Sequence, residues 1–395
     1  MGARHESEGD EMAQTGREVV IVAATRTPIG RRNGALRGEH PVMLAAQVLR
    51  AVTRQAGIEP EMVEDVVWGC VSQVGEQGYN VARNAVLAAG FPMEVPATTV
   101  DCQCGSDQQA IHFAANLIQS GVCEMTIAGG VESMSRVPMG SSVSVAGDPL
   151  PPSLLEAYPI THQGLAAEMI ADQWGISREQ MDALGLQSHQ RAAAAQDAGA
   201  FDREITPVAL SDGGTVARDE GIRRDTTLER LAALQPAFKP DGKVTAGSSS
   251  QISDGAAALL LTTPERAAAL GLRPRARIIA QRVVGVDPVT MLTGPIPATR
   301  QILERAGLTL DQIDLFEINE AFASVVLAWE KELHADMQRV NVNGGAIALG
   351  HPLGASGARL MVTLLHALEQ RNARYGLQAM CCGGGLGTAT IIERL

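Results

Sequence analysis

The sequence predicts an α/β protein built from two similar halves. The first observation behind this prediction is an internal repeat, and the second is a composition that suits a large core. Hydrophobic residues make up 45% of the 395 residues and charged residues only 19%, which is the balance of a folded globular protein. A chain of this length can form two or three domains.

The repeat consists of segments that occur in the same order in both halves. Residues 48–67 are expected to form a helix, a turn at Gly57, a short acidic helix and a strand, and residues 298–318 follow the same pattern around Gly307. The other pairs are the strands expected at 19–23 and 278–284, and the helix–strand units that begin at Cys104 and Gly354 and end in Gly129-Gly130 and Gly383-Gly384-Gly385. Repeated strand–helix–strand units predict two α/β halves related by a pseudo-twofold axis.

The domain boundaries follow from changes in composition along the chain. Residues 18–272 are expected to form an N-terminal domain and residues 273–395 a C-terminal domain. Residues 136–247 contain Pro and Ser clusters, a helical stretch at 166–198 and charged loops, so they are expected to be a loop domain inserted in the first half.

Charge and cysteine usage exclude several classes of function. A net charge of -12 disfavours nucleic-acid binding, and no apolar run is long enough to span a bilayer. Residues 1–17 are expected to be a disordered leader without the features of a signal or transit peptide, which favours a cytoplasmic protein with reduced thiols. The close cysteine pairs, Cys102-x-Cys104 and Cys381-Cys382, suit metal chelation poorly, so no metal site is expected.

Cys104 is the candidate nucleophile. It follows an apolar extended segment at 95–100 and precedes a helix whose apolar residues recur at helical spacing. The positive end of a helix and its free N–H groups favour the thiolate form of a nearby cysteine. Buried, inert cysteines are more common in general, but Cys-Gly-Ser at a strand-to-helix turn favours a nucleophile.

Three further positions suggest catalytic groups. His351 lies in a glycine-dense loop at 343–354, where it could act as a general base or merely hydrogen-bond a turn. The glycines from Gly383 onward leave backbone N–H groups open to a ligand oxygen, although a tight turn would also need glycine. Asn319 ends an expected strand, and its alternative role is a helix N-cap.

These motifs resemble those of the thiolase family in content and order. The motifs are Cys104-Gly105-Ser106, residues 128–135, Asn319-Glu320-Ala321-Phe322, Gly350-His351-Pro352 and Cys381-x-Gly383-Gly384-Gly385. Each motif is moderately specific, but five in order over residues 19–395 are highly specific. The resemblance implies the thiolase fold, with α-β-α-β-α layers and an inserted loop domain, and a homodimer or homotetramer.

The resemblance also implies roles for the catalytic residues. Cys104 would attack the 3-keto carbonyl and hold the acyl group as a thioester, while His351 takes its proton. Cys381, rather than Cys382, would protonate the departing acetyl-CoA carbanion and later deprotonate the incoming CoA. One oxyanion pocket would be formed by His351 with a water held by Asn319, and the other by the backbone N–H groups of Cys104 and Gly383.

Coenzyme A and acyl-CoA are the implied ligands, as substrates, with no tightly bound cofactor. Ser250 resembles a residue that contacts pantetheine, and Arg223 a basic residue near the adenine and phosphate, although the pair Arg223-Arg224 also fits a solvated face. The other substrate contacts implied are His162, Gln163, Met291, Ala321 and Phe322.

The expected reaction is thiolytic cleavage of a 3-ketoacyl-CoA in fatty-acid or sterol side-chain β-oxidation. The sequences of residues 251–255 and 291–300 resemble degradative thiolases most. Gln163 replaces the Met of biosynthetic members and Leu292 replaces a Gly, which favours a substrate larger than acetoacetyl-CoA. The alternatives are a biosynthetic acetoacetyl-CoA thiolase and a catalytically silent acyl-CoA-binding relative. A ketoacyl synthase is disfavoured because it would carry His or Asn in place of Cys381.

Two acidic residues depart from the family pattern near the nucleophile. Asp101 stands where Asn is usual, and Asp107 stands where a small residue is usual. If Cys104 caps the following helix, Asp107 lies three residues inside, where its charge opposes a thiolate. Asp107 is therefore expected to raise the pKa of Cys104, unless it points to solvent, pairs with a cation or is itself protonated.

Overall fold

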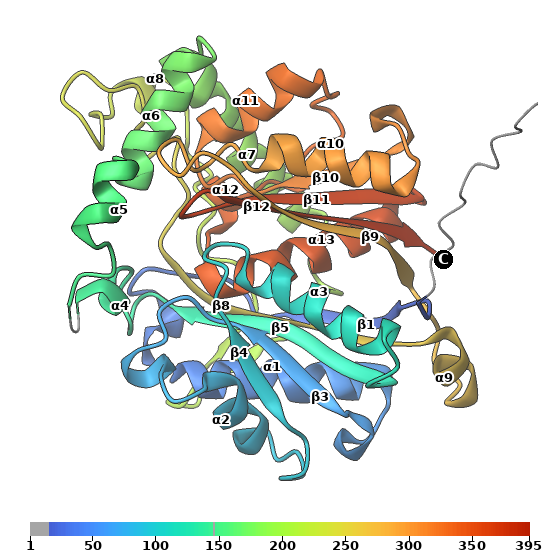
Figure 1. The fold of residues 1–395 in the computed structure, drawn as a ribbon. Coiled ribbons are helices and arrows are strands. Elements are labelled where there is room, and N and C mark those ends of the chain that lie inside the picture. Colours follow the sequence, from blue (N-terminus) through green and yellow to red (C-terminus); the bar gives the residue numbers. More distant parts are fainter. Residues whose placement is uncertain (1–15, 145–146) are drawn as a thin grey trace, which may run out of the picture.

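The computed structural model describes residues 16–144 and 147–395, and it folds into five layers in which helices alternate with sheets (Figure 1). The first half contains β1 (Val20–Arg26), β2 (Gly30–Arg31), α1 (Pro41–Ala56), β3 (Asp65–Gly69), α2 (Val81–Ala88), β4 (Ala97–Val100), α3 (Ser106–Gln119), β5 (Met125–Ser133), β8 (Ser253–Thr262) and α9 (Pro264–Ala269). The second half contains β9 (Ala276–Gly285), α10 (Pro295–Ala306), β10 (Leu315–Ile318), α11 (Ala323–Leu333), α12 (Ala346–Leu349), α13 (Ser356–Arg371), β11 (Tyr375–Cys382) and β12 (Leu386–Arg394).

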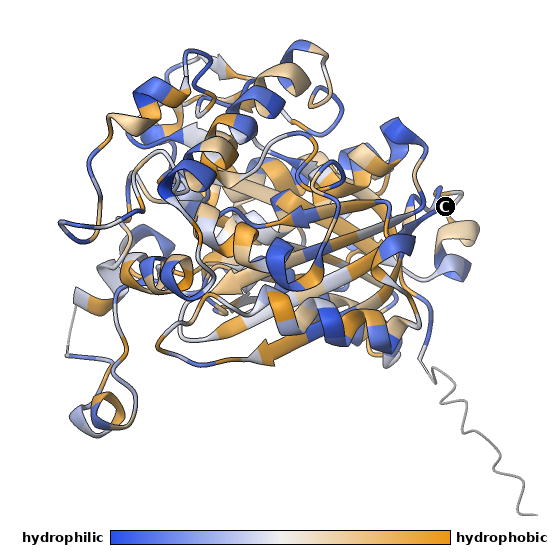
Figure 2. Ribbon diagram, turned by 90° about the horizontal axis from the view of Figure 1, so that it is seen from above, coloured by the Kyte–Doolittle hydropathy of each residue, from blue (hydrophilic) through white to orange (hydrophobic). Residues whose placement is uncertain are grey.

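The layers follow the predicted α-β-α-β-α order. Helices α1 and α2 cover the outer face of the first sheet, α10 and α11 cover the outer face of the second, and α3 and α13 lie between the sheets (Figure 1). Every residue from Ser356 to Leu368 of α13 is buried, as expected for a helix that is enclosed on all sides. Figure 2 shows that hydrophobic residues predominate in the strands at the centre, whereas hydrophilic residues gather on the outer helices and loops.

The sheet topology confirms the pseudo-twofold relation of the two halves. The strand order is β10-β11-β12-β9-β1-β8-β5-β3-β4, and the two sheets are joined only where Val20 and Ile21 of β1 pair with the start of β9. In the first half β3 is parallel to both β4 and β5, and in the second half β10 is parallel to β11. The remaining neighbours in the series are antiparallel.

The predicted repeat is confirmed in its local details. Helix α1 ends at Gly57 with φ 71° and α10 ends at Gly307 with φ 64°, both in the left-handed conformation that favours glycine at a helix end. In both halves a short 3₁₀ turn and a parallel strand follow, β3 in the first half and β10 in the second.

The segment between β5 and β8 carries its own small elements. These are α4 (Ser141–Ser144), α5 (Pro152–Ala157), α6 (Gln163–Gln173), α7 (Arg178–Asp197), β6 (Val208–Ala209), β7 (Thr215–Val216) and α8 (Leu228–Ala232). The helical stretch expected at 166–198 is two helices rather than one. Ser177 begins α7 with a capping box in which its hydroxyl and Gln180 satisfy each other's backbone N–H groups, and this ends the preceding turn.

Most of the expected leader, residues 1–15, lies outside the described residues. At the end of the expected leader, the Arg17 backbone N–H donates to Gln119 O at 3.3 Å. Within the described part of the chain, no helix combines the length and apolar character needed to cross a membrane.

Candidate active site

The loop that carries Cys104 joins β4 to α3 in a strained conformation. Gln103 has φ 51°, a left-handed value that costs a non-glycine residue about 1 kcal/mol or more. Asp101 Oδ1 accepts the Gln103 backbone N–H at 2.8 Å and supports this turn. The backbone N–H groups of Cys104 and Gly383 both point at the Cys104 sulfur. The nucleophile candidate therefore lies beside two preorganised donors.

Burial decides the protonation state of Cys104. Its side chain is 2% exposed, and this burial raises its pKa to about 12 in spite of the two backbone N–H groups, with Cys102 and Glu132 adding to the rise. The backbone N–H groups do favour the thiolate, as expected, but loss of water on burial outweighs their contribution. Cys104 rests as a thiol at neutral pH.

His351 is held as a neutral base with a defined tautomer. Its Nδ1 lies 2.5 Å from Ser356 Oγ, and that hydroxyl donates to Pro352 O at 2.8 Å. With the Ser356 hydroxyl donating to Pro352 O, we assign the ring proton to Nδ1, which leaves Nε2 as the acceptor nitrogen. Burial, followed by the charge of Arg359, lowers the pKa of His351 to about 3. The alternative role, a hydrogen bond to a turn, applies to Nδ1, which contacts Ser356. Nε2 takes no part in that contact and remains available for proton transfer.

The Asn319 side chain contacts His351 and does not cap a helix. Its Nδ2 lies 3.3 Å from His351 Nε2. Helix α11 begins at Ala323 with Phe322 at its N-cap position, so the N-cap alternative for Asn319 is wrong. Among the described residues, the buried Oδ1 of Asn319 has no hydrogen-bond partner. A buried amide with an open acceptor is suited to hold a water or a ligand group.

The two adjacent cysteines at the end of β11 have different surroundings. Burial and the charge of Cys104 raise the pKa of Cys381, and Cys104 also raises that of Cys382. Cys382 is hydrogen-bonded to Cys102, and a Cβ on Gly105 would come within 2.7 Å of its sulfur. Cys382 lies in the same hydrophobic cluster as Cys104, whereas Cys381 lies in the larger cluster that contains Ala321 and Phe322.

The glycines after Cys382 serve two purposes. Gly384 and Gly385 have φ values of 77° and 83°, so the tight-turn alternative holds for them. Gly383 does not need a positive φ, but a Cβ there would lie 2.7 Å from Gln163 Nε2. A side chain at Gly383 would therefore displace the end of the Gln163 side chain, and the Gly383 N–H is directed at Cys104.

Several of the expected substrate contacts converge around this centre. The Gln163 side chain reaches Gly383, and its neighbour His162 lies 5.4 Å from Phe238, which in turn packs edge-on against Phe322 at 5.8 Å between ring centroids. Met291 is buried in the same hydrophobic cluster as Phe322.

The proposed pantetheine segment lies alongside residues 321–322. Ser249 forms an antiparallel bridge with Phe322, and the Ser250 backbone N–H donates to Ala321 O at 3.0 Å. Arg223 is exposed, and its backbone N–H donates to His189 Nδ1. Arg224 pairs with Asp197, so only the Arg223 guanidinium remains as the basic group expected near a phosphate.

Asp107 is placed differently from the expectation. Helix α3 begins at Ser106 with Gly105 as N-cap, so Asp107 is its second residue and Cys104 lies outside the helix. The charges that raise the pKa of Cys104 are those of Cys102 and Glu132. Asp107 is fully buried, and burial raises its own pKa to about 8. Hydrogen bonds from several backbone N–H groups act in the opposite direction and lower this pKa.

Two supporting residues were missed by the sequence reasoning. Glu132, inside the motif at 128–135, is a buried carboxylate that accepts the backbone N–H groups of Val71 and Gly354 at 2.9 Å each. Ser356, the partner of His351, begins α13. An acidic residue in an otherwise apolar strand was the available signal for Glu132, whereas the Ser356 contact depends on loop geometry.

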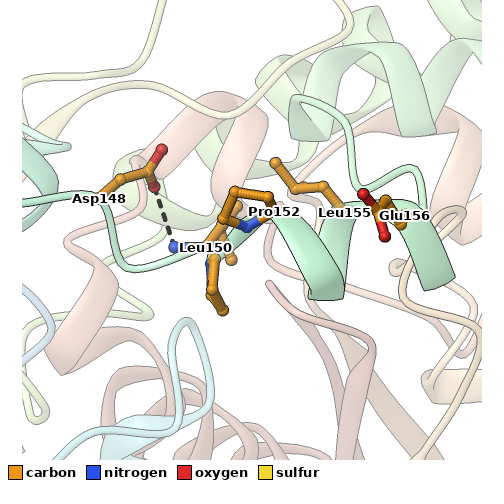
Figure 3. A pocket seen from close by; sticks show the side chains of 6 residues that line it. Asp148, Leu150, Pro152, Leu155 and Glu156 are labelled. Atoms are coloured by element: carbon orange, nitrogen blue, oxygen red, sulfur yellow. Dashed lines mark hydrogen bonds between the residues drawn. The ribbon is translucent and has the colours of Figure 1, made fainter.

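A surface pocket in the inserted region is lined by none of these residues. It has a volume of about 670 Å³ and is lined by Asp148, Leu150, Pro151, Pro152, Leu155 and Glu156 (Figure 3). All six come from one short segment of the inserted region, so it offers no convergent catalytic groups. Within the described residues, no cluster of His, Cys, Asp or Glu could hold a metal ion.

We expect iodoacetamide to modify Cys102 before Cys104 in the free protein. A hydrogen bond from Cys382 lowers the pKa of the half-buried Cys102, whereas a pKa of about 12 for Cys104 leaves a thiolate fraction of about 10⁻⁴ at pH 8. The Cys104 rate should still rise tenfold per pH unit at pH 9. Peptide mapping over time checks this, and a Cys104 rate that reaches a plateau below pH 8 would contradict it.

Comparison with known proteins gives consistent matches over nearly the whole chain. Residues 19–265 match the family model described as the thiolase N-terminal domain, and residues 272–394 match the thiolase C-terminal domain. A steroid 3-ketoacyl-CoA thiolase of Mycobacterium tuberculosis is 49% identical over 387 residues, which cover 96% of this chain and 94% of that protein.

A second relative and a solved structure extend the comparison. A 3-ketoacyl-CoA thiolase of Pectobacterium carotovorum is 50% identical over 388 residues, covering 96% of this chain and all of that one. The crystal structure of a Bacillus anthracis acetyl-CoA acetyltransferase superposes with a TM-score of 0.89 at 43% identity, covering 97% of this chain and 100% of that one.

Proposed function

Because the chain belongs to the thiolase family, we propose that it cleaves 3-ketoacyl-CoA with CoA to give acetyl-CoA and a shortened acyl-CoA. The observations that carry this proposal are the two backbone N–H groups at the Cys104 sulfur, the buried Cys381 thiol whose pKa the charge of Cys104 raises, and the buried His351–Asn319 pair. The relatives named for 3-ketoacyl-CoA and steroid substrates support the degradative direction.

The first half of the reaction forms an acyl thioester on Cys104. Both Cys104 and His351 are neutral at rest, since burial raises the pKa of the first to about 12 and lowers that of the second to about 3. We therefore place proton transfer from the thiol to Nε2 in the attack on the 3-keto carbon itself. The oxyanion that forms there would be held by the backbone N–H groups of Cys104 and Gly383.

Carbon–carbon cleavage then releases the acetyl-CoA enolate. The protonated Nε2 can donate to its thioester oxygen, together with a water held by Asn319. Cys381 would give its proton to the enolate carbon, which completes acetyl-CoA and leaves a Cys381 thiolate. That thiolate takes the proton of the incoming CoA, whose sulfur attacks the acyl-Cys104 thioester. The released Cys104 thiolate takes back its proton from His351, which restores both thiols and the neutral imidazole.

Substrate contacts are assigned to the surrounding residues. Gln163, His162 and Phe322 would border the acyl group, together with Met291. The pantetheine would lie along Ser250 and Ala321, and the exposed Arg223 would meet a phosphate. CoA thus acts as a co-substrate, with no tightly bound cofactor.

We further infer that the protein is a homodimer or homotetramer. Strand β4 is at the edge of the sheet and pairs only with β3 within the described chain, and an edge strand is a ready template for another chain. Exposed Tyr79 and Met93 lie on segments next to this edge, at 96% and 74% exposure. The division into domains at 18–272 and 273–395, with the loop domain at 136–247, and the cytoplasmic location remain predictions.

A panel of 3-ketoacyl-CoA substrates tests the substrate proposal. We expect medium-chain or sterol-type substrates to have kcat/KM values at least about tenfold above acetoacetyl-CoA, because each buried methylene contributes about 0.8 kcal/mol. Release of acetyl-CoA is measured at fixed CoA. The similarity to an acetyl-CoA acetyltransferase makes the biosynthetic reaction the second candidate, and it would prevail if acetoacetyl-CoA had the highest kcat/KM.

A further inference from the structure

Asp107 is a buried carboxyl group between the first turns of the two central helices. Its Oδ1 accepts the Gly357 backbone N–H at 2.7 Å and its Oδ2 accepts that of Ala358 at 2.6 Å. The N–H groups of Asp107 and Gln108, in its own helix, also point toward it. One carboxyl group therefore accepts hydrogen bonds from N–H groups of both α3 and α13. These N–H groups lie in the first turn of each helix, where the helix itself offers them no acceptor.

The space around Asp107 is shaped by glycines from three different elements. A Cβ on Gly357 of α13 would lie 2.7 Å from Asp107 Oδ1, and one on Gly130 of β5 would lie 2.8 Å from Asp107 Cβ. A Cβ on Gly69 of β3 would come within 2.5 Å of the Asp107 backbone nitrogen. These glycines let the helix starts approach closely enough for a two-carbon acidic side chain to bridge them.

The bridge connects the segments that carry the two reacting groups. Asp107 follows Cys104 by three residues, so it belongs to the first turn after the nucleophile. Gly357 directly follows Ser356, whose hydroxyl orients His351 through its 2.5 Å contact with Nδ1. A shift of α13 relative to α3 would move Ser356, and with it the imidazole, relative to the Cys104 sulfur.

We propose that Asp107 is a positioning residue that fixes the distance and orientation between His351 and Cys104 by tying α13 to α3. This inference rests on the proposed function, since it assigns Asp107 a part in the step in which His351 takes the Cys104 proton. Glu132 makes a separate tie by accepting the Gly354 N–H, so loss of Asp107 loosens the junction without removing every contact across it.

Two substitutions at Asp107 and one matched control test the proposal. Asp107→Ser removes both acceptors of the α13 N–H groups, whereas Asp107→Asn keeps one acceptor oxygen in the same volume. The control is Asp314→Asn. Asp314 Oδ2 likewise accepts two successive backbone N–H groups, those of Arg374 and Tyr375, at 2.8 Å each, but it lies where β10 and β11 begin, away from the site.

We expect kcat of Asp107→Ser to fall roughly 10- to 100-fold, because a displacement of a reacting group by about 1 Å lowers the catalytic rate by about this factor. Asp107→Asn should lose less, and KM for CoA should stay within about threefold in both variants because the CoA contacts lie elsewhere. The Nδ1 proton signal of His351, followed by NMR of protein labelled at histidine nitrogens, should shift in both variants. Asp314→Asn should match the parent in kcat and in that signal.

The outcomes separate failure of this inference from failure of the proposed function. A parent protein that cleaves no 3-ketoacyl-CoA of the panel would defeat the proposed function. A parent that does, together with an Asp107→Ser variant whose kcat lies within twofold and whose His351 signal is unshifted, would overturn the positioning role. If Asp107→Ser does not fold, the signal and kcat of Asp107→Asn decide by the same criteria, with thermal unfolding used to verify that the variant is folded.

Discussion

Replacing Cys104 by Ala is expected to remove thiolysis, with kcat lowered by roughly 10⁶-fold, the scale of loss when a covalent nucleophile is deleted. The other cysteines near the site cannot substitute for it. Cys381 is buried near the end of β11 in a different hydrophobic cluster from Cys104, and Cys102 is hydrogen-bonded to Cys382. The two N–H groups that would hold the oxyanion are directed at the position of the Cys104 sulfur.

Mass spectrometry of the acylated peptide is the direct measurement. Incubation with a 3-ketoacyl-CoA in the absence of free CoA should leave the acyl group on Cys104, and Cys104→Ala should retain none. Cys102→Ser serves as the control, because the half-buried Cys102 carries the lowered pKa and is the cysteine that nonspecific acylation would favour. Acyl label on Cys102 or Cys381 with Cys104 free would contradict the assignment.

The fold could be predicted from sequence where local signals repeat. Helix, glycine stop, short turn and strand follow one another around Gly57 and again around Gly307, and both glycines adopt the left-handed conformation that explains the pattern. The joining of the two sheets could not be predicted in this way. It depends on a few residues of β1 and β9 that are distant in sequence, and periodicity carries no signal of such pairing.

The sequence allowed us to predict which residues belong to the site, but not how their surroundings shift their pKa values. Cys104, Asn319 and Cys381 lie at the ends of strands or the start of a helix, which the sequence pattern indicates. The net pKa shift of Cys104 could not be predicted, because the helix terminus is visible in the sequence and the burial of the sulfur is not. The same holds for Asp107, whose partners on α13 lie 250 residues away in the chain.

The roles of the two adjacent cysteines should separate clearly by mutation. Cys381→Ala is expected to lower kcat for thiolysis by roughly 10²- to 10⁴-fold, the range for removal of a general acid or base. The thiol is neutral in the folded protein because burial raises its pKa, so it is suited to give a proton to an enolate carbon. Acylation of Cys104 by an acyl-CoA should persist at a reduced rate, since the nucleophile and its two N–H donors remain.

Cys382→Ala is the matched control, because it removes the same atoms one residue later on the same strand. Cys382 contacts Cys102 and lies under Gly105, so its loss should reduce the free energy of unfolding by about 1 kcal/mol and change kcat by less than about threefold. Steady-state thiolysis, acyl-CoA labelling of Cys104 and thermal unfolding are measured on both variants. The assignment fails if Cys382→Ala is inactive while folded and Cys381→Ala turns over at the parent rate, since the proton donor would then lie on the other face of β11.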